Sequence, residues 1–133
     1  MKLHHVGVVV KAIGRDGHHL AQSFGLDPVS EVIHDPTQGV NVQFWGAGAD
    51  VSIEFIEPAV PDSRVGQFLE KGGGLAHICF EVPDLEIALT EAESKGAIPV
   101  QPPSPAPAFD GRRIAFLYYR GLGLVEFVEA AKP

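Results

Sequence analysis

The sequence predicts an α+β protein made of two repeated βαβββ modules, each with a strand, a helix and three further strands. Two internal alignments predict the repeat: residues 42–57 match residues 114–129 without a gap, and residues 3–10 match residues 75–82. The offset is 72 residues in both alignments. In each copy, runs of β-branched and aromatic residues lie between turn residues, a pattern typical of strands joined as hairpins.

The first copy begins with a Val-rich strand at residues 3–10 and a helix at residues 13–24, where apolar side chains recur at roughly helical spacing. Gly25 is placed to end that helix. Three strands are predicted to follow, over residues 29–33, 40–45 and 51–56. The turn residues at 46–50 predict that the last two strands form a hairpin.

The second copy follows a connection in which Ser63 is placed to cap a short helix ending at residue 71. After a strand at residues 75–82, Asp84 is the expected N-cap of a helix that ends at Gly96. That helix is predicted to bury Leu85, Ala88, Leu89 and Ala92. The remaining predicted segments are a strand beginning at residues 98–100, a loop with four prolines at residues 101–111, and a hairpin of residues 114–119 and 122–128.

A length of 133 residues predicts a single domain that is large enough to bury a core. The repeat divides it into module one at residues 1–58, a connecting helix at residues 59–73 and module two at residues 74–133. The proline-rich loop lies inside module two, between strands that must pair. A rigid rim loop is therefore the favoured interpretation, and not a linker between domains.

Composition excludes several classes of partner. The 17 acidic residues outnumber the 10 basic ones, which argues against binding to nucleic acid. No apolar run approaches the roughly 20 residues of a membrane helix, or forms a signal-peptide core. We therefore expect a cytoplasmic protein with no membrane partner. The single cysteine, Cys79, cannot form an internal disulfide, and its apolar neighbours favour a buried thiol.

Two histidines and two glutamates occupy equivalent positions in the two copies. His5 corresponds to His77 and Glu54 to Glu126, and each histidine precedes its glutamate by 49 residues. Both glutamates lie within apolar strands, where burial of an uncompensated carboxylate is costly. Any one of these residues alone would be read as a core histidine or a solvent-facing acid. Four ligand-type residues related by one offset instead predict a metal site.

The predicted site would hold one divalent metal ion. Two carboxylates balance its charge, and two neutral imidazoles complete four protein ligands, with positions left open for water or substrate. Zn, Ni, Co, Mn and Fe(II) all fit this set of oxygen and nitrogen ligands. The pair His5 and Glu54 could join His77 and Glu126 within one chain or across a dimer. The neighbouring His4 points to the opposite face of its strand and is not expected to be a ligand.

The duplicated module with these four residues resembles the vicinal oxygen chelate superfamily, which includes glyoxalases, bleomycin-resistance proteins and dioxygenases. The likeness extends from residue 3 to residue 129. Several segments are most similar to the methylmalonyl-CoA epimerases: VSIEFIEP at residues 51–58, DS at 62–63, FLEK at 68–71, AHIC at 76–79 and IAFL at 114–117. The resemblance implies a cupped, partly open β-barrel with helices outside and one metal within, and a homodimer.

The resemblance further implies a metal-dependent isomerase or epimerase that moves a proton beside the carbonyl of an acyl thioester. Chelation of the substrate oxygens would stabilise the developing enolate, while a carboxylate removes the α-proton. Glu126 is the expected catalytic base, since a carboxylate at the metal can be positioned beside the substrate carbon. Glu54 is expected to serve as a ligand, and this position often carries Gln in the family.

One stretch departs from the epimerases. They resemble one another in a Glu-Gln-Gly-Val sequence that supplies a second acid or base, whereas residues 37–40 of this chain read TQGV. Epimerisation requires groups on both faces of a planar intermediate, and Thr37 cannot act as a base near neutral pH. Either Asp35 or His34 substitutes from the same loop, or the reaction needs only one base.

Two alternative functions remain. A lactoylglutathione lyase of the glyoxalase I type also needs only one metal-bound carboxylate, but bacterial glyoxalases carry an Arg where this chain has Val8 and Val9. A non-catalytic small-molecule-binding or resistance protein of the same fold typically lacks the four ligands. Dioxygenases are disfavoured because they usually use two histidines and a single carboxylate. Arg112 and Arg113 could hold an anionic group of a substrate or simply solvate a strand start.

Overall fold

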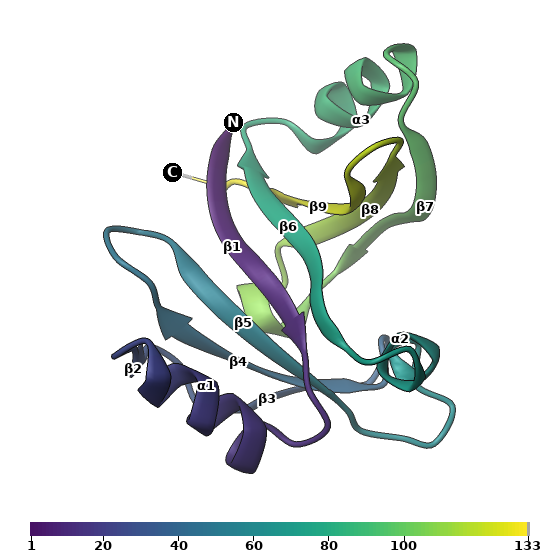
Figure 1. Cartoon of the computed structure of the whole chain (residues 1–133). Coiled ribbons are helices and arrows are strands. Elements are labelled where there is room, and N and C mark those ends of the chain that lie inside the picture. The colour runs from purple at the N-terminus through teal and green to yellow at the C-terminus, as the bar shows by residue number, and fades with distance from the viewer. Residues whose placement is uncertain (133) are drawn as a thin grey trace. The chain divides into compact units, whose positions relative to one another are not determined.

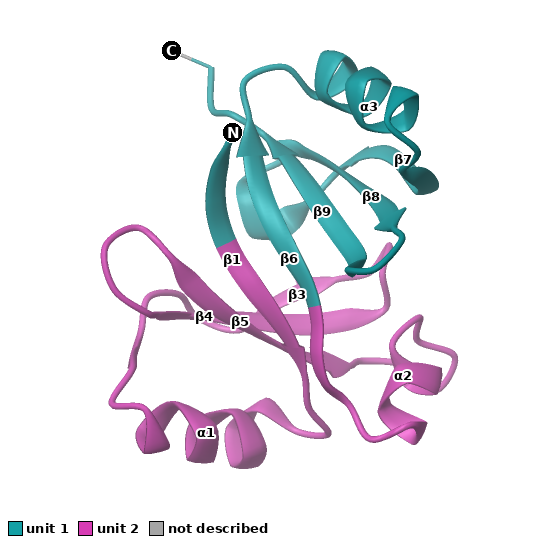
Figure 2. Ribbon diagram, turned by 45° about the horizontal axis from the view of Figure 1, so that its top comes forward, with its two compact units in different colours: residues 1–4, 77–133 teal, residues 5–76 magenta. Residues whose placement is uncertain are grey.

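The computed structural model describes residues 1–132 and divides the chain into two compact units. The first unit holds residues 5–76, and the second holds residues 1–4 with the chain from residue 77 onward (Figure 2). The division follows the predicted repeat except at the two leading strands, because residues 3–4 fall in the second unit and residues 75–76 in the first. The single domain, with module boundaries at residues 58 and 73, stays a prediction.

The first unit is built on strands β1 and β5, which run parallel, and on β4, which pairs with β5 in the antiparallel direction. Two short strands, β2 and β3, pair with β4. The bounds are β1 Lys2–Val9, β2 Asp27–Pro28, β3 Ile33–Asp35, β4 Val40–Gly46 and β5 Ser52–Pro58. The strands predicted for the β1, β4 and β5 regions are confirmed to within two residues at each end.

Helix α1, His18–Ser23, continues a π-helical segment, η1, Ile13–Gly17, and covers one face of β4 and β5 (Figure 1). The predicted helix is confirmed, but its first turn is wider than an α-helix because the N–H of Gly17 reaches back to the carbonyl of Ala12. Beneath it lies a small hydrophobic core that includes Ile13, Ala21, Trp45 and Phe55.

The strand predicted over residues 29–33 is wrong. Its place is taken by the loop between β2 and β3 and by the first residue of β3. In this loop the N–H of Val29 donates to the carbonyl of Phe44 at 3.0 Å, and Ser30 makes two further contacts to β4. The Ser30 hydroxyl accepts a hydrogen bond from the N–H of Phe44 at 3.0 Å, and its carbonyl accepts one from the Gln43 side chain at 3.1 Å. A side chain thus replaces part of the backbone ladder, as Ser commonly does in turns and loops.

The connection between the two copies contains helix α2, Gly66–Glu70, which is shorter than predicted. Ser63 does not cap it, because the residue before the helix is Val65 and no side chain caps that end. The Ser63 hydroxyl instead lies 3.4 Å from the Val65 N–H, a long and weak contact.

The second unit repeats this order with an uninterrupted α-helix and with one long strand, β7, in place of β2 and β3. Its strands are arranged β6, β9, β8, β7, with β6 and β9 parallel and the other neighbours antiparallel. The bounds are β6 Gly74–Val82, α3 Leu85–Ser94, β7 Ile98–Pro105, β8 Arg113–Tyr119 and β9 Gly123–Glu129. Figure 1 shows α3 packed against this group of strands.

Helix α3 is confirmed in detail. The Asp84 carboxylate accepts a hydrogen bond from the N–H of Ile87 at 3.0 Å and caps the helix as predicted. Leu85, Ala88 and Ala92 are buried in a core with residues of β8 and β9, and Leu89 packs against that core. Among residues 1–132, no helix is both long enough and apolar enough to cross a membrane.

The proline-rich loop predicted at residues 101–111 is wrong in its first half. Strand β7 continues through three of the four prolines to Pro105 and is followed by a single 3₁₀ turn, η2, Pro107–Phe109. The register with β8 shifts twice along this stretch. Prolines are tolerated because β7 ends the strand order of its unit, where one side of the strand needs no ladder donors.

Candidate metal centre

In the first unit, the pairing of β1 with β5 brings His5 against Glu54. The strands are parallel, with Gly7 opposite Glu54 and His5 opposite Ser52, so both side chains project from the same face. His5 Nε2 lies 3.3 Å from Glu54 Oε1. Both residues are buried, with 0% and 5% of their surface exposed.

The second unit repeats this arrangement between β6 and β9. Here Cys79 is opposite Glu126 and His77 is opposite Leu124, which is the same register shifted by 72 residues. His77 Nε2 lies 3.2 Å from Glu126 Oε1, and both residues are buried. Each unit therefore presents one imidazole nitrogen and one carboxylate oxygen at nearly equal separation.

A phenylalanine fixes each histidine ring. Phe44, on β4, lies opposite Glu54 of β5. Its ring packs edge to face on the His5 ring, with 5.3 Å between the ring centroids. Phe116, on β8, lies opposite Glu126 of β9, and its ring centroid is 5.5 Å from that of His77. Such edge contacts restrict the orientation of an imidazole. Phe44 and Phe116 are also 72 residues apart, which is the one signal in the sequence that marks them as equivalent.

The chemistry of each pair suits a divalent metal ion. A carboxylate that is almost fully buried needs a compensating charge, and a neutral imidazole alone supplies only a hydrogen bond. Imidazole nitrogen and carboxylate oxygen are ligands that Zn, Ni, Co, Mn and Fe(II) accept. The residues that could hold such an ion are His5 with Glu54 in the first unit and His77 with Glu126 in the second.

The two arginines proposed as an anion site are engaged in ion pairs within the second unit. Arg113 pairs with Glu86 at 2.7 Å and with Glu129 at 3.0 Å. These contacts hold the pKa of the Glu129 carboxyl below its usual value, mainly through hydrogen bonds from the Arg113 guanidinium and backbone. Arg112 pairs with Glu81 at 3.0 Å. The structural interpretation of both arginines is therefore favoured over substrate binding.

The other four histidines are exposed or half-buried. His18 and His19 are exposed, and the His18 ring meets Trp45 at 5.0 Å. The ring of His4, which is half-buried, packs against Phe109 at 5.1 Å. His34 is exposed, and its Nδ1 lies 2.9 Å from Asn41 Oδ1.

Comparison with known proteins gives consistent matches along the chain. Residues 4–116 match the model of a family described as the Glyoxalase/Bleomycin resistance protein/Dioxygenase superfamily. The mitochondrial methylmalonyl-CoA epimerase of Mus musculus is 30% identical over 133 residues, which cover 97% of this chain and 73% of the mouse protein.

Two solved structures are similar over nearly the whole chain. A hypothetical protein of Bacillus halodurans is 30% identical, with a TM-score of 0.86, and the match covers 99% of this chain and 96% of that one. The methylmalonyl-CoA epimerase of Mycobacterium tuberculosis is 25% identical, with a TM-score of 0.84, and the match covers 98% of this chain and 89% of that one.

Proposed function

Because the chain belongs to the glyoxalase/bleomycin resistance protein/dioxygenase superfamily, we propose that it is a metal-dependent epimerase that moves a proton α to the carbonyl of an acyl thioester. The observation that carries the proposal is the repetition of one buried His–Glu pair in both units, at 3.3 and 3.2 Å. Similarity to methylmalonyl-CoA epimerases of mouse and Mycobacterium tuberculosis supports a branched malonyl thioester of coenzyme A as substrate.

We propose that the two pairs share one divalent ion, so that His5, Glu54, His77 and Glu126 are its protein ligands. The ion would supply positive charge beside the thioester carbonyl as negative charge develops on its oxygen. The two buried carboxylates balance the charge of a divalent ion, and the two phenylalanine rings pack edge to face on the imidazoles.

Glu126 is the proposed base. Its carboxylate removes the α-proton, and the electrons of the C–H bond pass into the enolate of the thioester. Burial excludes water from this carboxylate, which strengthens its electrostatic interaction with the substrate. Glu54 has the same surroundings but is assigned only to metal binding, because the resemblance to the superfamily implies a ligand at Glu54 and the base at Glu126.

The first experiment is metal analysis of the purified protein, followed by solvent deuterium incorporation into methylmalonyl-CoA. Bound metal together with exchange of the α-proton is the expected result. The same assay with the hemithioacetal of methylglyoxal and glutathione tests the lyase alternative. Turnover of that adduct alone would move the assignment to a glyoxalase, and no exchange in either compound after metal loading would indicate a binding protein.

The homodimer expected from the resemblance is also a proposal. Sedimentation equilibrium of the metal-loaded protein measures it directly, and a mass of one chain at micromolar concentration would refute it.

A further inference from the structure

One buried carboxylate is not used by the metal centre. Among residues 1–132, the buried carboxylic acids are Glu54, Glu126 and Asp35. The first two belong to the His–Glu pairs. Asp35, at the end of β3, has only 7% of its surface exposed and carries no role in the reaction described so far. Aspartate is rarely buried to this degree without a specific reason.

Asp35 lies on the same face of its sheet as Glu54. It is directly opposite Val40, and side chains of directly opposite residues lie on one face. Alternation along β4 places Val40 and Phe44 on that face, and Phe44 is opposite Glu54. The carboxylate of Asp35 and the His5–Glu54 pair therefore share one face of the first unit.

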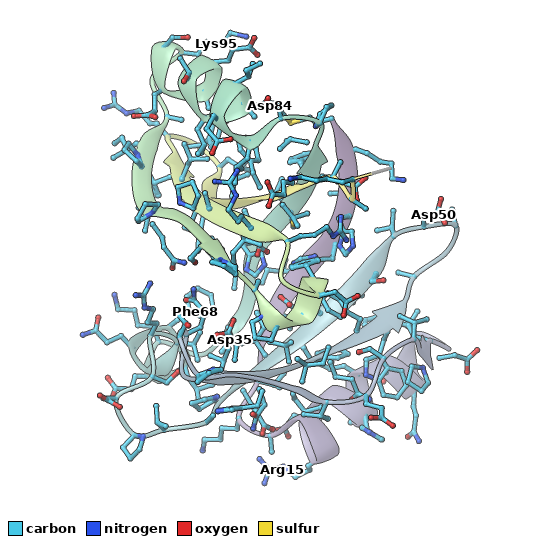
Figure 3. The ribbon with its side chains drawn as sticks, turned by 180° about the vertical axis from the view of Figure 1, so that it is seen from behind. Arg15, Asp35, Asp50, Phe68, Asp84 and Lys95 are labelled. Atoms are coloured by element: carbon cyan, nitrogen blue, oxygen red, sulfur yellow. The ribbon has the colours of Figure 1, made fainter. Side chains whose placement is uncertain are left out.

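The surroundings of Asp35 belong to a tight turn between β3 and β4. Its Oδ1 accepts a hydrogen bond from the N–H of Gln38 at 3.1 Å, and Gly39, with φ +68°, closes the turn. A side chain at Gly39 would meet Val60, which shows how closely the connection packs on this turn. Arg15, at the outer edge of the same unit in Figure 3, has 71% of its side chain exposed, whereas Asp35 has 7% of its surface exposed.

This turn explains why the side chain of Asp35 accepts a hydrogen bond, but it does not explain why the residue is a carboxylic acid. Asparagine also forms such turns and accepts the same hydrogen bond through its amide oxygen. A role limited to the turn would therefore be served by either residue, whereas proton transfer requires the acid.

The other two candidates in this loop are less suitable. His34 is opposite Asn41, on the other face of β3, and its Nδ1 contacts the Asn41 side chain. The Asn41 amide in turn donates to Glu57 at 2.9 Å, on that same face. Thr37 is exposed in the turn, and its hydroxyl does not ionise near neutral pH.

We infer, on the basis of the proposed function, that Asp35 is the second acid and base of the epimerisation. Inversion at the α-carbon requires a proton to leave one face of the planar enolate and another to arrive at the opposite face. Glu126 takes the proton from one epimer, and the protonated Asp35 donates its own proton to the opposite face of the α-carbon. Glu126 is left protonated and Asp35 ionised, and exchange with solvent resets both. The reverse direction uses the same groups with their roles exchanged.

Asp35 and Glu54 are separated along β4 by four residues, about 13 Å, and across the sheet by the two strand spacings from β3 to β4 and from β4 to β5, about 5 Å each. Their α-carbons are therefore about 16 Å apart on one face. A substrate held at the His5–Glu54 pair would have to extend toward β3 for the Asp35 carboxylate to reach its α-carbon.

The test compares Asp35→Asn, which keeps the hydrogen bond to Gln38, with Glu126→Gln. Each metal-loaded protein is incubated in deuterium oxide with each epimer of methylmalonyl-CoA, and both inversion and α-exchange are measured. Asp35→Asn is expected to lower inversion by about 10²-fold or more, the usual loss for a general acid–base group. It should still exchange the α-proton of one epimer without inversion, and Glu126→Gln should exchange only the other epimer.

Two further measurements separate catalysis from folding. Metal content, the unfolding midpoint and the dissociation constant for methylmalonyl-CoA should each match wild type in Asp35→Asn. His34→Gln, one residue away and on the opposite face, serves as the matched control and should invert at the wild-type rate.

Inversion at the wild-type rate by Asp35→Asn, or an equal loss of exchange in both epimers, would overturn the assignment of Asp35 and leave the proposed function standing. A wild-type protein that exchanges neither epimer would instead overturn the proposed function, and this inference with it.

Discussion

The two units place the same three side chains in the same way but support them differently. In each unit, a histidine, a glutamate and a phenylalanine are held by equivalent strand registers. On the opposite face of these strands, the second unit has an ion pair between Arg113 and Glu129. The first unit has, at the same repeat positions, a hydrogen bond from the uncharged Asn41 amide to the Glu57 carboxylate. The geometry of the ligand pair therefore depends on strand register and aromatic packing, and not on the charge of the supporting residues.

Substitution of the two glutamates should have the greatest effect on turnover, and it should show that the two residues are not equivalent. Glu126→Gln should lower turnover by about 10²- to 10⁴-fold, the usual contribution of a general base, with the fold intact. Glu54→Gln should cost clearly less, because an amide oxygen can still bind the metal. Steady-state kinetics on methylmalonyl-CoA with metal-loaded proteins measures both. Equal losses in the two variants would show that the pairs are functionally symmetric, and full activity of Glu126→Gln would refute the assigned base.

The next effect tests whether the two histidines are equivalent. His5→Ala and His77→Ala should each weaken metal binding by more than the roughly 10–100-fold lost when an outer partner of a metal ligand is removed. Competition with a chelator gives the dissociation constants. Unchanged metal affinity in either variant would remove that histidine from the ligand set.

A smaller effect, on the free energy of unfolding, is expected from substitution of the two residues predicted to cap helices. Asp84→Ala should lower the free energy of unfolding by about 1 kcal/mol, because it removes an observed N-cap contact. Ser63→Ala should change it by less than about 0.5 kcal/mol, since its hydroxyl makes only a long contact and caps no helix. Urea denaturation of the two variants checks the difference, and equal losses would contradict the capping assignment.

The smallest effect concerns acid stability of the second unit. Because Arg113 lowers the pKa of Glu129 below its ordinary value of 4.5, the folded state favours the ionised form. This stabilisation is fully present at neutral pH. Its loss begins as the pH falls below about 4.5 and is complete once the pH is below the lowered pKa of Glu129. The stability difference between wild type and Glu129→Gln, about 0.5–1 kcal/mol at neutral pH for a partly exposed pair, should shrink in that range. A difference that stays constant as the pH is lowered would show that the ionisation of Glu129 does not contribute.

Much of the fold could be predicted because the sequence repeat locates most of its strands. The offset of 72 residues locates the equivalent strands and both His–Glu pairs, and the α+β class and the superfamily are confirmed. The failures occur where a local signal was overridden. Ser30 replaces backbone pairing in a segment that looks like a strand, and β7 continues through prolines because it ends the strand order of its unit.

The candidate site was predictable only in part. Spacing identified the four ligand-type residues, since the offset relates them in pairs. It could not separate Asp35 from His34, because neighbouring residues on a strand differ only in the face to which they point. That difference depends on the pairing of β3 with β4, which the predicted strand at residues 29–33 misplaced.

The stoichiometry of metal binding decides whether the two His–Glu pairs share one ion. If the pairs in the two units share one ion, calorimetric titration of the metal-free protein with Zn, Ni or Co should reach one ion per chain. His5→Ala and His77→Ala should then each remove that same binding event. Two independent ions per chain, or a variant that loses only half of the bound metal, would contradict a shared site. No binding of any of the tested ions would contradict the metal centre itself.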